Sequence, residues 1–191
     1  SYGFGDGAEV SCENTVNAVS NLLYGLPIHA WYSLNTKAVT IVNDALGGVE
    51  VIPDENNKPY LPSKAVIGEP FLLKSGYATR FISLRGEFND SHRRTRQKQY
   101  MSAFVKKAKS VISKNPLIVT DILSQIKSYS VTGLTVDEIV YLATESISMD
   151  INTDFTVLKG EECVKDGKVE FTPDKSALYE LMLETFYVQV E

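Results

Sequence analysis

The sequence contains little cysteine, histidine or arginine, and it has no long apolar run. Its 191 residues include two cysteines and two histidines, and these side chains do not form the closely spaced pairs that typically bind zinc. No apolar stretch approaches the roughly 18 residues that a membrane-spanning helix needs. The sequence therefore predicts neither a zinc module nor a transmembrane segment within these residues.

The two cysteines, Cys12 and Cys163, leave two interpretations open. In the first they are separate thiols that are partly buried, as is common for small apolar side chains. In the second they form one long-range disulfide, as happens in an oxidising compartment.

Apolar residues are present in sufficient number for a folded core. They make up 43% of the chain and aromatic residues 10%, which argues against disorder. Helical patterns alternate with short apolar segments typical of strands, and no repeat or linker interrupts them. We therefore predict one α/β domain over residues 1–191, with helices packed on a sheet.

Local signals predict the positions of these elements. Helices are predicted over 8–24, 36–46, 75–84 and 91–113, then from Pro116, from Thr135 as an N-cap, and from 172–174. Strands are predicted over 28–34, 49–52, 155–158 and 169–171, and residues 54–68 are predicted as a loop. The turn at 165–168 predicts a hairpin between the last two strands.

The most informative feature is the placement of arginine. All five arginines lie between residues 80 and 96: Arg80, Arg85, Arg93, Arg94 and Arg96. The window 80–109 holds nine Lys and Arg against two acids, a net +7, whereas the remainder holds ten against 22, a net −12. A guanidinium presents a planar fork of donors that matches phosphate or carboxylate, so this concentration predicts an anion-binding segment.

The helix predicted from Ser91 aligns this segment with the core. Helical spacing places six residues on one face: Arg93, Gln97, Tyr100, Phe104, Ala108 and Val111. A buried arginine without a partner is costly, so Arg93 needs an acid, such as Asp90, or a bound phosphate. The N-terminus of the helix also favours an anion. A basic face that is simply solvated is the competing interpretation, and the acidic chain as a whole argues against nucleic acid.

Several segments together resemble the LytR-CpsA-Psr family. They are residues 1–5, 14–16, 26–28, 44–49, 81–85, 90–97 and 166–174. The most specific is the pattern D-x-x-R-x-x-R-Q, which follows Arg85 and consists here of Asp90, Arg93, Arg96 and Gln97. The resemblance covers essentially the whole chain.

This resemblance implies a three-layer α-β-α domain with a mixed central sheet and helices on both faces. It implies a phosphotransferase that moves glycan polymers, of teichoic acid or capsular polysaccharide type, from a polyprenyl pyrophosphate carrier to peptidoglycan. The implied partners are thus the lipid-linked glycan and the peptidoglycan acceptor, without nucleic acid. The implied location is the extracellular face of the cytoplasmic membrane, in the cell envelope of a Gram-positive bacterium, with a membrane anchor upstream of this sequence.

The resemblance also assigns roles to residues. Arg85, Arg93, Arg96 and Gln97 bind the pyrophosphate; Arg85, Asp90 and Arg93 are the catalytic set, in which Asp90 orients an arginine or assists the acceptor hydroxyl. A Mg²⁺ ion neutralises the pyrophosphate, and its ligands are expected upstream of Ser1, so no metal ligand is assigned within the sequence. Because those upstream parts are needed, we expect the 191-residue chain alone to be inactive.

Two positions depart from the family pattern. Ser83 stands where the first arginine of an R-x-R motif is usual, and His92 replaces the usual glycine before Arg93. The alternative function is therefore a non-catalytic module that binds polyprenyl phosphate and senses or regulates the envelope.

Overall fold

The computed structural model describes residues 5–84, 90–153, 156–166 and 168–187. The chain divides into two compact units. Unit 1 combines Ser1–His29 with Thr156–Glu191, and unit 2 is Ala30–Phe155. The two ends of the chain thus belong to one unit, and the whole arginine segment belongs to the other.

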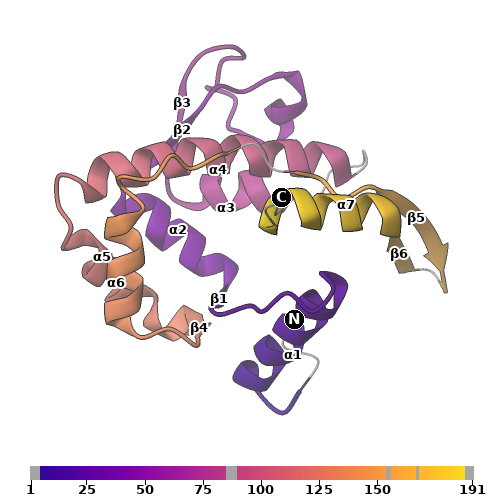
Figure 1. Cartoon of the computed structure of the whole chain (residues 1–191). Coiled ribbons are helices and arrows are strands. Elements are labelled where there is room, and N and C mark those ends of the chain that lie inside the picture. The colour runs from indigo at the N-terminus through magenta and orange to yellow at the C-terminus, as the bar shows by residue number, and fades with distance from the viewer. Residues whose placement is uncertain (1–4, 85–89, 154–155, 167, 188–191) are drawn as a thin grey trace. The chain divides into compact units, whose positions relative to one another are not determined.

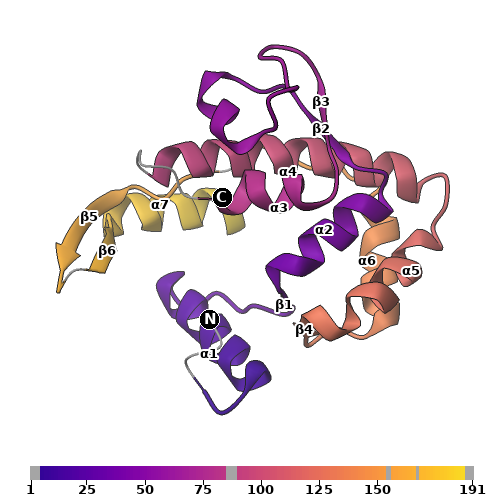
Figure 2. The same cartoon turned by 180° about the vertical axis from the view of Figure 1, so that it is seen from behind.

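Unit 2 consists of helices and two short sheets (Figure 1). Its elements are β1 (Tyr32–Leu34), α2 (Thr36–Ala45), β2 (Val49–Val51), the 3₁₀ helix η1 (Glu55–Tyr60), β3 (Phe71–Leu73), α3 (Gly76–Ser83), α4 (Asp90–Ile112), α5 (Ile118–Ile126), the 3₁₀ helix η2 (Lys127–Tyr129), β4 (Ser130–Thr132) and α6 (Val136–Glu145). β1 pairs with β4 and β2 with β3, both antiparallel. Both views show β2 and β3 on one side of α4 and α3 on another (Figures 1 and 2).

A hydrophobic core joins β2, β3, α3 and α4. Val49 and Leu73 are partners across the two strands, and both are fully buried. Phe81 of α3 is also fully buried, and Tyr100 of α4 stacks on Phe104 with 5.9 Å between the ring centroids. Burial of each such side chain contributes roughly 1.5–3 kcal/mol. This core therefore fixes α4 beside the end of α3.

Buried polar groups connect the same elements. Asn43 of α2 donates its amide to the Leu73 carbonyl at 2.9 Å and accepts a hydrogen bond from the Tyr100 hydroxyl at 3.3 Å. The adjacent Asp44 carboxylate accepts from the backbone N–H of Ser75 at 2.9 Å. The buried amide is thereby satisfied and links α2, β3 and α4, while Asp44 anchors the residue that precedes α3.

Unit 1 consists of α1 (Ala8–Leu22), β5 (Gly160–Lys165), β6 (Lys168–Pro173) and α7 (Lys175–Phe186). β5 and β6 form an antiparallel hairpin. The Tyr24 hydroxyl, just after α1, donates to the Lys175 carbonyl at 2.9 Å, and the Tyr24 ring packs edge-on against Tyr179 at 5.5 Å. The Asp174 side chain accepts from the backbone of Ser176 and caps α7.

The structure gives both cysteines as free thiols. Cys12 is buried within α1, and Cys163 is exposed within β5. This result agrees with the first of the two interpretations above, two separate thiols.

The predicted mixture of helices and strands is confirmed, as are the hairpin at 165–168 and the N-cap at Thr135. The sheet arrangement differs from the expectation. The described strands pair as three separate two-stranded antiparallel sheets instead of one mixed central sheet. Each of β1 to β4 is three residues long and has one described partner, so each pair offers only a short ladder of hydrogen bonds.

Three local predictions are corrected. Residues 156–159 form no strand, and β5 begins instead at Gly160, opposite Pro173 of β6; Phe155, the other residue of that predicted strand, lies outside the described residues. The loop predicted over 54–68 contains η1, whose first turn is capped by the Asp54 side chain. β3 was not predicted. The strand predicted over 28–34 is confined to Tyr32–Leu34, where pairing with β4 is available.

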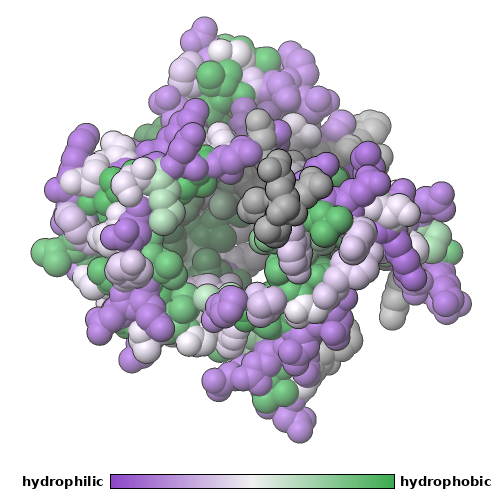
Figure 3. Space-filling model, viewed as in Figure 1, coloured by the Kyte–Doolittle hydropathy of each residue, from purple (hydrophilic) through white to green (hydrophobic). Residues whose placement is uncertain are grey.

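Large apolar side chains are also exposed, among them Leu117, Val157 and Val164. Apolar residues lie interspersed with hydrophilic ones on the face seen in Figure 3. Within the described residues, no helix combines the length and the apolar character needed to span a membrane.

Candidate functional site

The residues predicted to bind phosphate lie at the junction of α3 and α4. Arg93, Arg96 and Gln97 lie on the first two turns of α4, and Asp90 is its first residue. The side chain of Asp90 and the whole of Arg85 lie outside the described residues. Four of the five predicted residues thus belong to one helix, and the structure describes the side chains of three of them.

Arg96 is the largest fully buried side chain, with 1% of its surface exposed. Its Nε donates to the Phe81 carbonyl at 2.6 Å, and its Nη2 donates to the Leu84 carbonyl. Its guanidinium also stacks on the Tyr60 ring, 3.6 Å from the centroid. The last carbonyls of a helix have no partner within the helix, so Arg96 supplies the donors that the end of α3 requires.

Gln97 supports the same helix end. Its Nε2 donates to the Ile82 carbonyl at 3.0 Å. Together with Arg96 it binds three carbonyls at the last turn of α3, which are those of Phe81, Ile82 and Leu84. These contacts fix the backbone immediately before Arg85 in the sequence.

Burial determines the electrostatics of Arg96. Removal from water lowers its pKa below the ordinary value for arginine, and the positive charge of Arg93 lowers it further, while Tyr60 and Asp54 oppose this shift. An arginine nevertheless remains protonated at neutral pH. Its Nη1 is buried and has no hydrogen-bond partner among the described residues. A buried donor of this kind is costly unless an acceptor is bound to it.

The other arginines are more accessible. Arg93 is half-buried, one helical turn before Arg96. Arg80 and Arg94 are exposed, and Arg80 donates to the Pro59 carbonyl at 3.1 Å. Among the described residues of the predicted set, Arg93 thus combines a helix N-terminus with partial exposure, which suits contact with a soluble or membrane-borne anion.

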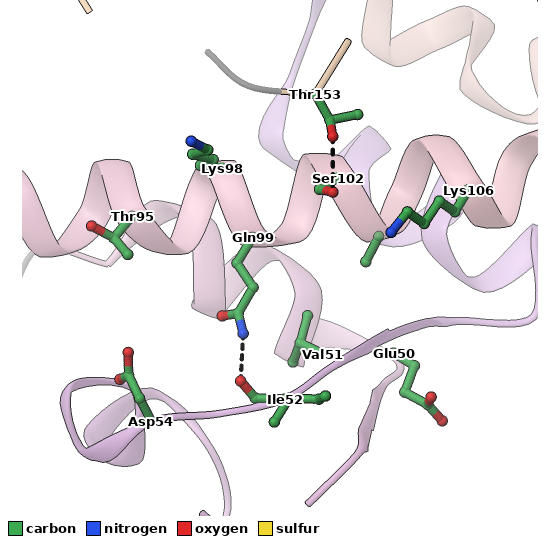
Figure 4. Close-up of a pocket in the computed structure, with 11 residues that line it drawn as sticks. Glu50, Val51, Ile52, Asp54, Thr95, Lys98, Gln99, Ser102, Lys106 and Thr153 are labelled. Carbon is green, nitrogen blue, oxygen red and sulfur yellow. Dashed lines mark hydrogen bonds between the residues drawn. The ribbon is translucent and has the colours of Figure 1, made fainter. Parts of the chain in front are cut away.

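A cavity of about 590 Å³ lies along α4 (Figure 4). One wall is α4, through Thr95, Lys98, Gln99, Ser102, Ala103 and Lys106; the others are Glu50, Val51, Ile52, Asp54 and Thr153. Sequence reasoning did not find this cavity. The spacing of the polar residues at 95, 98, 99, 102 and 106 predicts one polar face of the helix. It does not predict which segments of the chain lie across from that face.

The magnesium prediction placed the metal ligands upstream of Ser1. No group of three or more Asp, Glu, His or Cys side chains gathers in the part of the chain that the structure describes. Mg²⁺ usually requires carboxylate oxygens as protein ligands. The Mg²⁺ ligands expected upstream of Ser1 stay a prediction.

Comparison with known proteins identifies the family. The model of the LytR_cpsA_psr family matches residues 2–185. The chain belongs to the LytR-CpsA-Psr family. No curated protein sequence matches it.

Solved structures share the fold of this family member. Lin1025 from Listeria innocua is 25% identical, with a TM-score of 0.71, and the alignment covers 90% of this chain and 74% of that one. TagV from B. subtilis is 18% identical, with a TM-score of 0.67 and coverage of 98% and 78%. TagT bound to LI-WTA is 20% identical, with a TM-score of 0.67 and coverage of 95% and 71%.

The family defines the general class of activity. LytR-CpsA-Psr proteins are phosphotransferases that act on cell-wall glycopolymers at the envelope of Gram-positive bacteria. A helix N-terminus that carries Arg93, Arg94 and Arg96 is consistent with this class, because phosphoryl transfer depends mainly on positioning and on stabilising phosphate charge.

Proposed function

We propose that this chain is the phosphate-binding part of an enzyme that transfers a glycan polymer from polyprenyl pyrophosphate to peptidoglycan, on the extracellular side of the membrane. The polymer is of teichoic acid or capsular polysaccharide type. The observation that carries the proposal is the position of Arg93 on the first turn of α4, beside buried Arg96, in a chain of this family. TagT, which shares the fold, binds LI-WTA.

In the proposed reaction, the acceptor hydroxyl attacks the phosphorus that carries the glycan. The bridging P–O bond then breaks, and polyprenyl phosphate leaves. Arg85 and Arg93 stabilise the charge that develops on the phosphate oxygens, as preorganised donors do in phosphoryl transfer. Asp90 orients an arginine or accepts the proton of the attacking hydroxyl.

Arg96 and Gln97 belong to the same proposed site. Their contacts with the α3 carbonyls leave Nη1 of Arg96 and Oε1 of Gln97 outside these three hydrogen bonds. Both residues thus support the backbone before Arg85. The proposal further assigns both residues to the binding of pyrophosphate.

The first experiment measures binding of inorganic pyrophosphate to the 191-residue chain by calorimetry at low salt. We expect Arg93→Ala to weaken binding by about 1.5–3 kcal/mol, roughly 10- to 150-fold, the usual value for a hydrogen bond to a charged group. Arg94→Ala is the matched control, because Arg94 is adjacent and exposed. Equal affinities of the two variants would rule out the arginine site.

One observation favours a second function, a non-catalytic module that binds polyprenyl phosphate. Ser83, which replaces the first arginine of the usual R-x-R motif, is exposed at the end of α3, so this position contributes no positive charge. The two functions are separated by a transfer assay on the complete gene product, with lipid-linked glycan, peptidoglycan and Mg²⁺. Release of polyprenyl phosphate supports the enzyme, whereas binding without turnover supports the module.

A further inference from the structure

The strand β5 has a free edge. Among the described strands it pairs only with β6, and all six of its residues are exposed. An edge strand presents unpaired N–H and C=O groups, and proteins commonly protect such an edge with proline, a bulge or an inward-pointing charge. β5 contains no proline, and its pairing with β6 runs through all six residues without a bulge. The edge is therefore open to a further strand.

The pairing with β6 determines which backbone groups of β5 face this edge. The backbone N–H of Asp174 donates to the Lys159 carbonyl at 2.9 Å, and these two residues continue the register of the hairpin by one position. Hydrogen-bonded and non-hydrogen-bonded pairs alternate along an antiparallel ladder. Gly160, Glu162 and Val164, at the alternate positions, therefore direct their N–H and C=O groups at the free edge.

The outer edge of β6 is less suited to accept a strand. Pro173 lies opposite Gly160, so its backbone also faces away from the hairpin. Proline has no N–H, and a strand added beside β6 would lose one hydrogen bond at this position. The edge of β5 is thus the more favourable of the two.

The charges of β5 fit a second copy of the same strand in one register. Two antiparallel copies related by a two-fold axis form hydrogen bonds when the edge-facing residues of one lie opposite those of the other. With Cys163 on the axis, Glu161 of each copy lies opposite Lys165 of the other, and no like charges are opposed. An axis at residue 161, 162 or 164 places two carboxylates opposite each other. Opposite charges stabilise a cross-strand pair and like charges destabilise it.

We propose that this chain self-associates through β5, which pairs antiparallel with β5 of a second copy, with Cys163 at the two-fold axis and Glu161 opposite the second copy's Lys165. The two hairpins then form one four-stranded sheet, and the free edge of β5 is covered. The contact is small, so the expected dissociation constant is roughly 0.1–1 mM. The inference does not rest on the proposed function, because β5 belongs to unit 1 and the arginine segment to unit 2.

The first test is sedimentation equilibrium of the 191-residue chain with reductant at low salt, over about 0.01–1 mM protein. Glu161→Lys and Lys165→Glu should each weaken dimerisation about tenfold, because both cross-strand pairs become repulsive. The double variant Glu161→Lys/Lys165→Glu restores opposite charges and should recover the affinity of the unmodified chain. Glu180→Lys, on exposed α7 surface, changes the net charge equally and is the matched control, with affinity unchanged.

The second test determines the register, with Cys163 as a reporter. In the proposed pairing the two Cys163 side chains form a non-hydrogen-bonded pair, in which side chains lie closest. Diamide, which oxidises two thiols to one disulfide, should therefore produce a covalent dimer on a non-reducing gel. The control Cys163→Ser/Val164→Cys moves the thiol by one residue, opposite the second copy's Glu162, and should react about tenfold more slowly.

Three results would overturn the proposal. The first is a monomer over the whole concentration range. The second is failure of the double charge swap to recover the affinity lost in the single variants. The third is an equal rate of disulfide formation at residues 163 and 164, which would indicate random collision or another register. None of these results changes the expected effect of Arg93→Ala on pyrophosphate binding, so the two proposals fail separately.

Discussion

Burial divides the arginines of the segment into two groups. Arg80 and Arg94 are exposed and Arg93 is half-buried, whereas Arg96 is buried and directs Nε and Nη2 at the carbonyls of Phe81 and Leu84. The planar fork of arginine suits both tasks, since it matches a pair of carbonyls as well as a phosphate. The same residue type therefore holds the end of α3 at one position and is available for a ligand at another.

Replacement of Arg96 tests how much its contacts with α3 and Tyr60 contribute to stability. Arg96→Ala removes two charge-assisted hydrogen bonds and the stacking on Tyr60, so we expect a loss of about 3 kcal/mol in the free energy of unfolding. Arg96→Lys keeps the charge but cannot donate to two carbonyls in the same geometry, so it should recover less than half of this loss. Urea unfolding followed by Trp31 fluorescence gives the values. If Arg96→Ala is as stable as Arg94→Ala, Arg96 does not stabilise α3.

Tyr100 predicts a pH dependence of stability. Burial raises the pKa of its hydroxyl, and the charge of Asp44 raises it further. A pKa raised in the folded state means that the stability contributed by this group is complete below the unfolded pKa, about 10, and is lost as the pH rises above it. Tyr100→Phe should lower stability at pH 8 by about 1 kcal/mol, through loss of the bond to Asn43.

Tyr100→Phe should also show a smaller decrease in the free energy of unfolding as the pH rises from 8 to 10.5, because phenylalanine does not titrate. Urea midpoints of both proteins at pH 8 and pH 10.5 provide the measurement. If the urea midpoint fell equally in the wild-type protein and in Tyr100→Phe, groups other than Tyr100 would cause the loss of stability at alkaline pH.

At the scale of elements, the turn before β2 depends on glycine. Gly48 has a φ of 90°, and a Cβ at this position would lie 2.9 Å from the Leu73 carbonyl oxygen. Gly68 has a similar φ of 82° but open space around it. Gly48→Ala should therefore destabilise by about 2–4 kcal/mol, and Gly68→Ala by about 1 kcal/mol, since both carry backbone strain but only the first adds a steric clash. Thermal unfolding of the two variants provides the measurement. An equal loss of stability in Gly48→Ala and Gly68→Ala would exclude the steric clash at Gly48.

The elements that sequence predicted well are those with local signals. The helix that begins after Thr135 has a complete capping box with Glu138, and the second half of α4 has Tyr100, Phe104 and Val111 at helical spacing. β3 was missed because Phe71-Leu72-Leu73 is short and lacks alternation. It becomes a strand through pairing with Val49–Val51, about 20 residues earlier. Such non-local pairing leaves no local pattern to detect.

The candidate site was likewise predictable only where its residues lie close together in the sequence. The arginine segment was visible because its residues are close in sequence. The support that Arg96 and Gln97 give to the end of α3 was not visible, since it depends on how α3 packs on α4. The cavity was not visible either, because Glu50, Asp54 and Thr153 come from segments far from α4 in the sequence.

On the scale of the whole molecule, charge is distributed unevenly. Residues 80–109 carry a net +7 and the remainder a net −12, which gives the overall −5. An acidic chain repels anionic polymers in general, whereas its single basic segment attracts them at one place. The distribution therefore favours a defined anion site over nonspecific binding, and it implies that binding weakens as salt screens the charges.

The two thiols give a test that involves the chain as a whole, because Cys12 and Cys163 lie 151 residues apart in sequence and belong to the same unit. Cys163 is exposed and Cys12 is buried, and both are free. We expect a thiol reagent to label one cysteine quickly in the native protein and both after unfolding without reductant, because the reagent reaches only accessible thiols. Cys163→Ser should abolish the fast reaction and leave one thiol in denaturant. Failure to label either cysteine of the unfolded, unreduced protein would instead demonstrate a disulfide between α1 and β5.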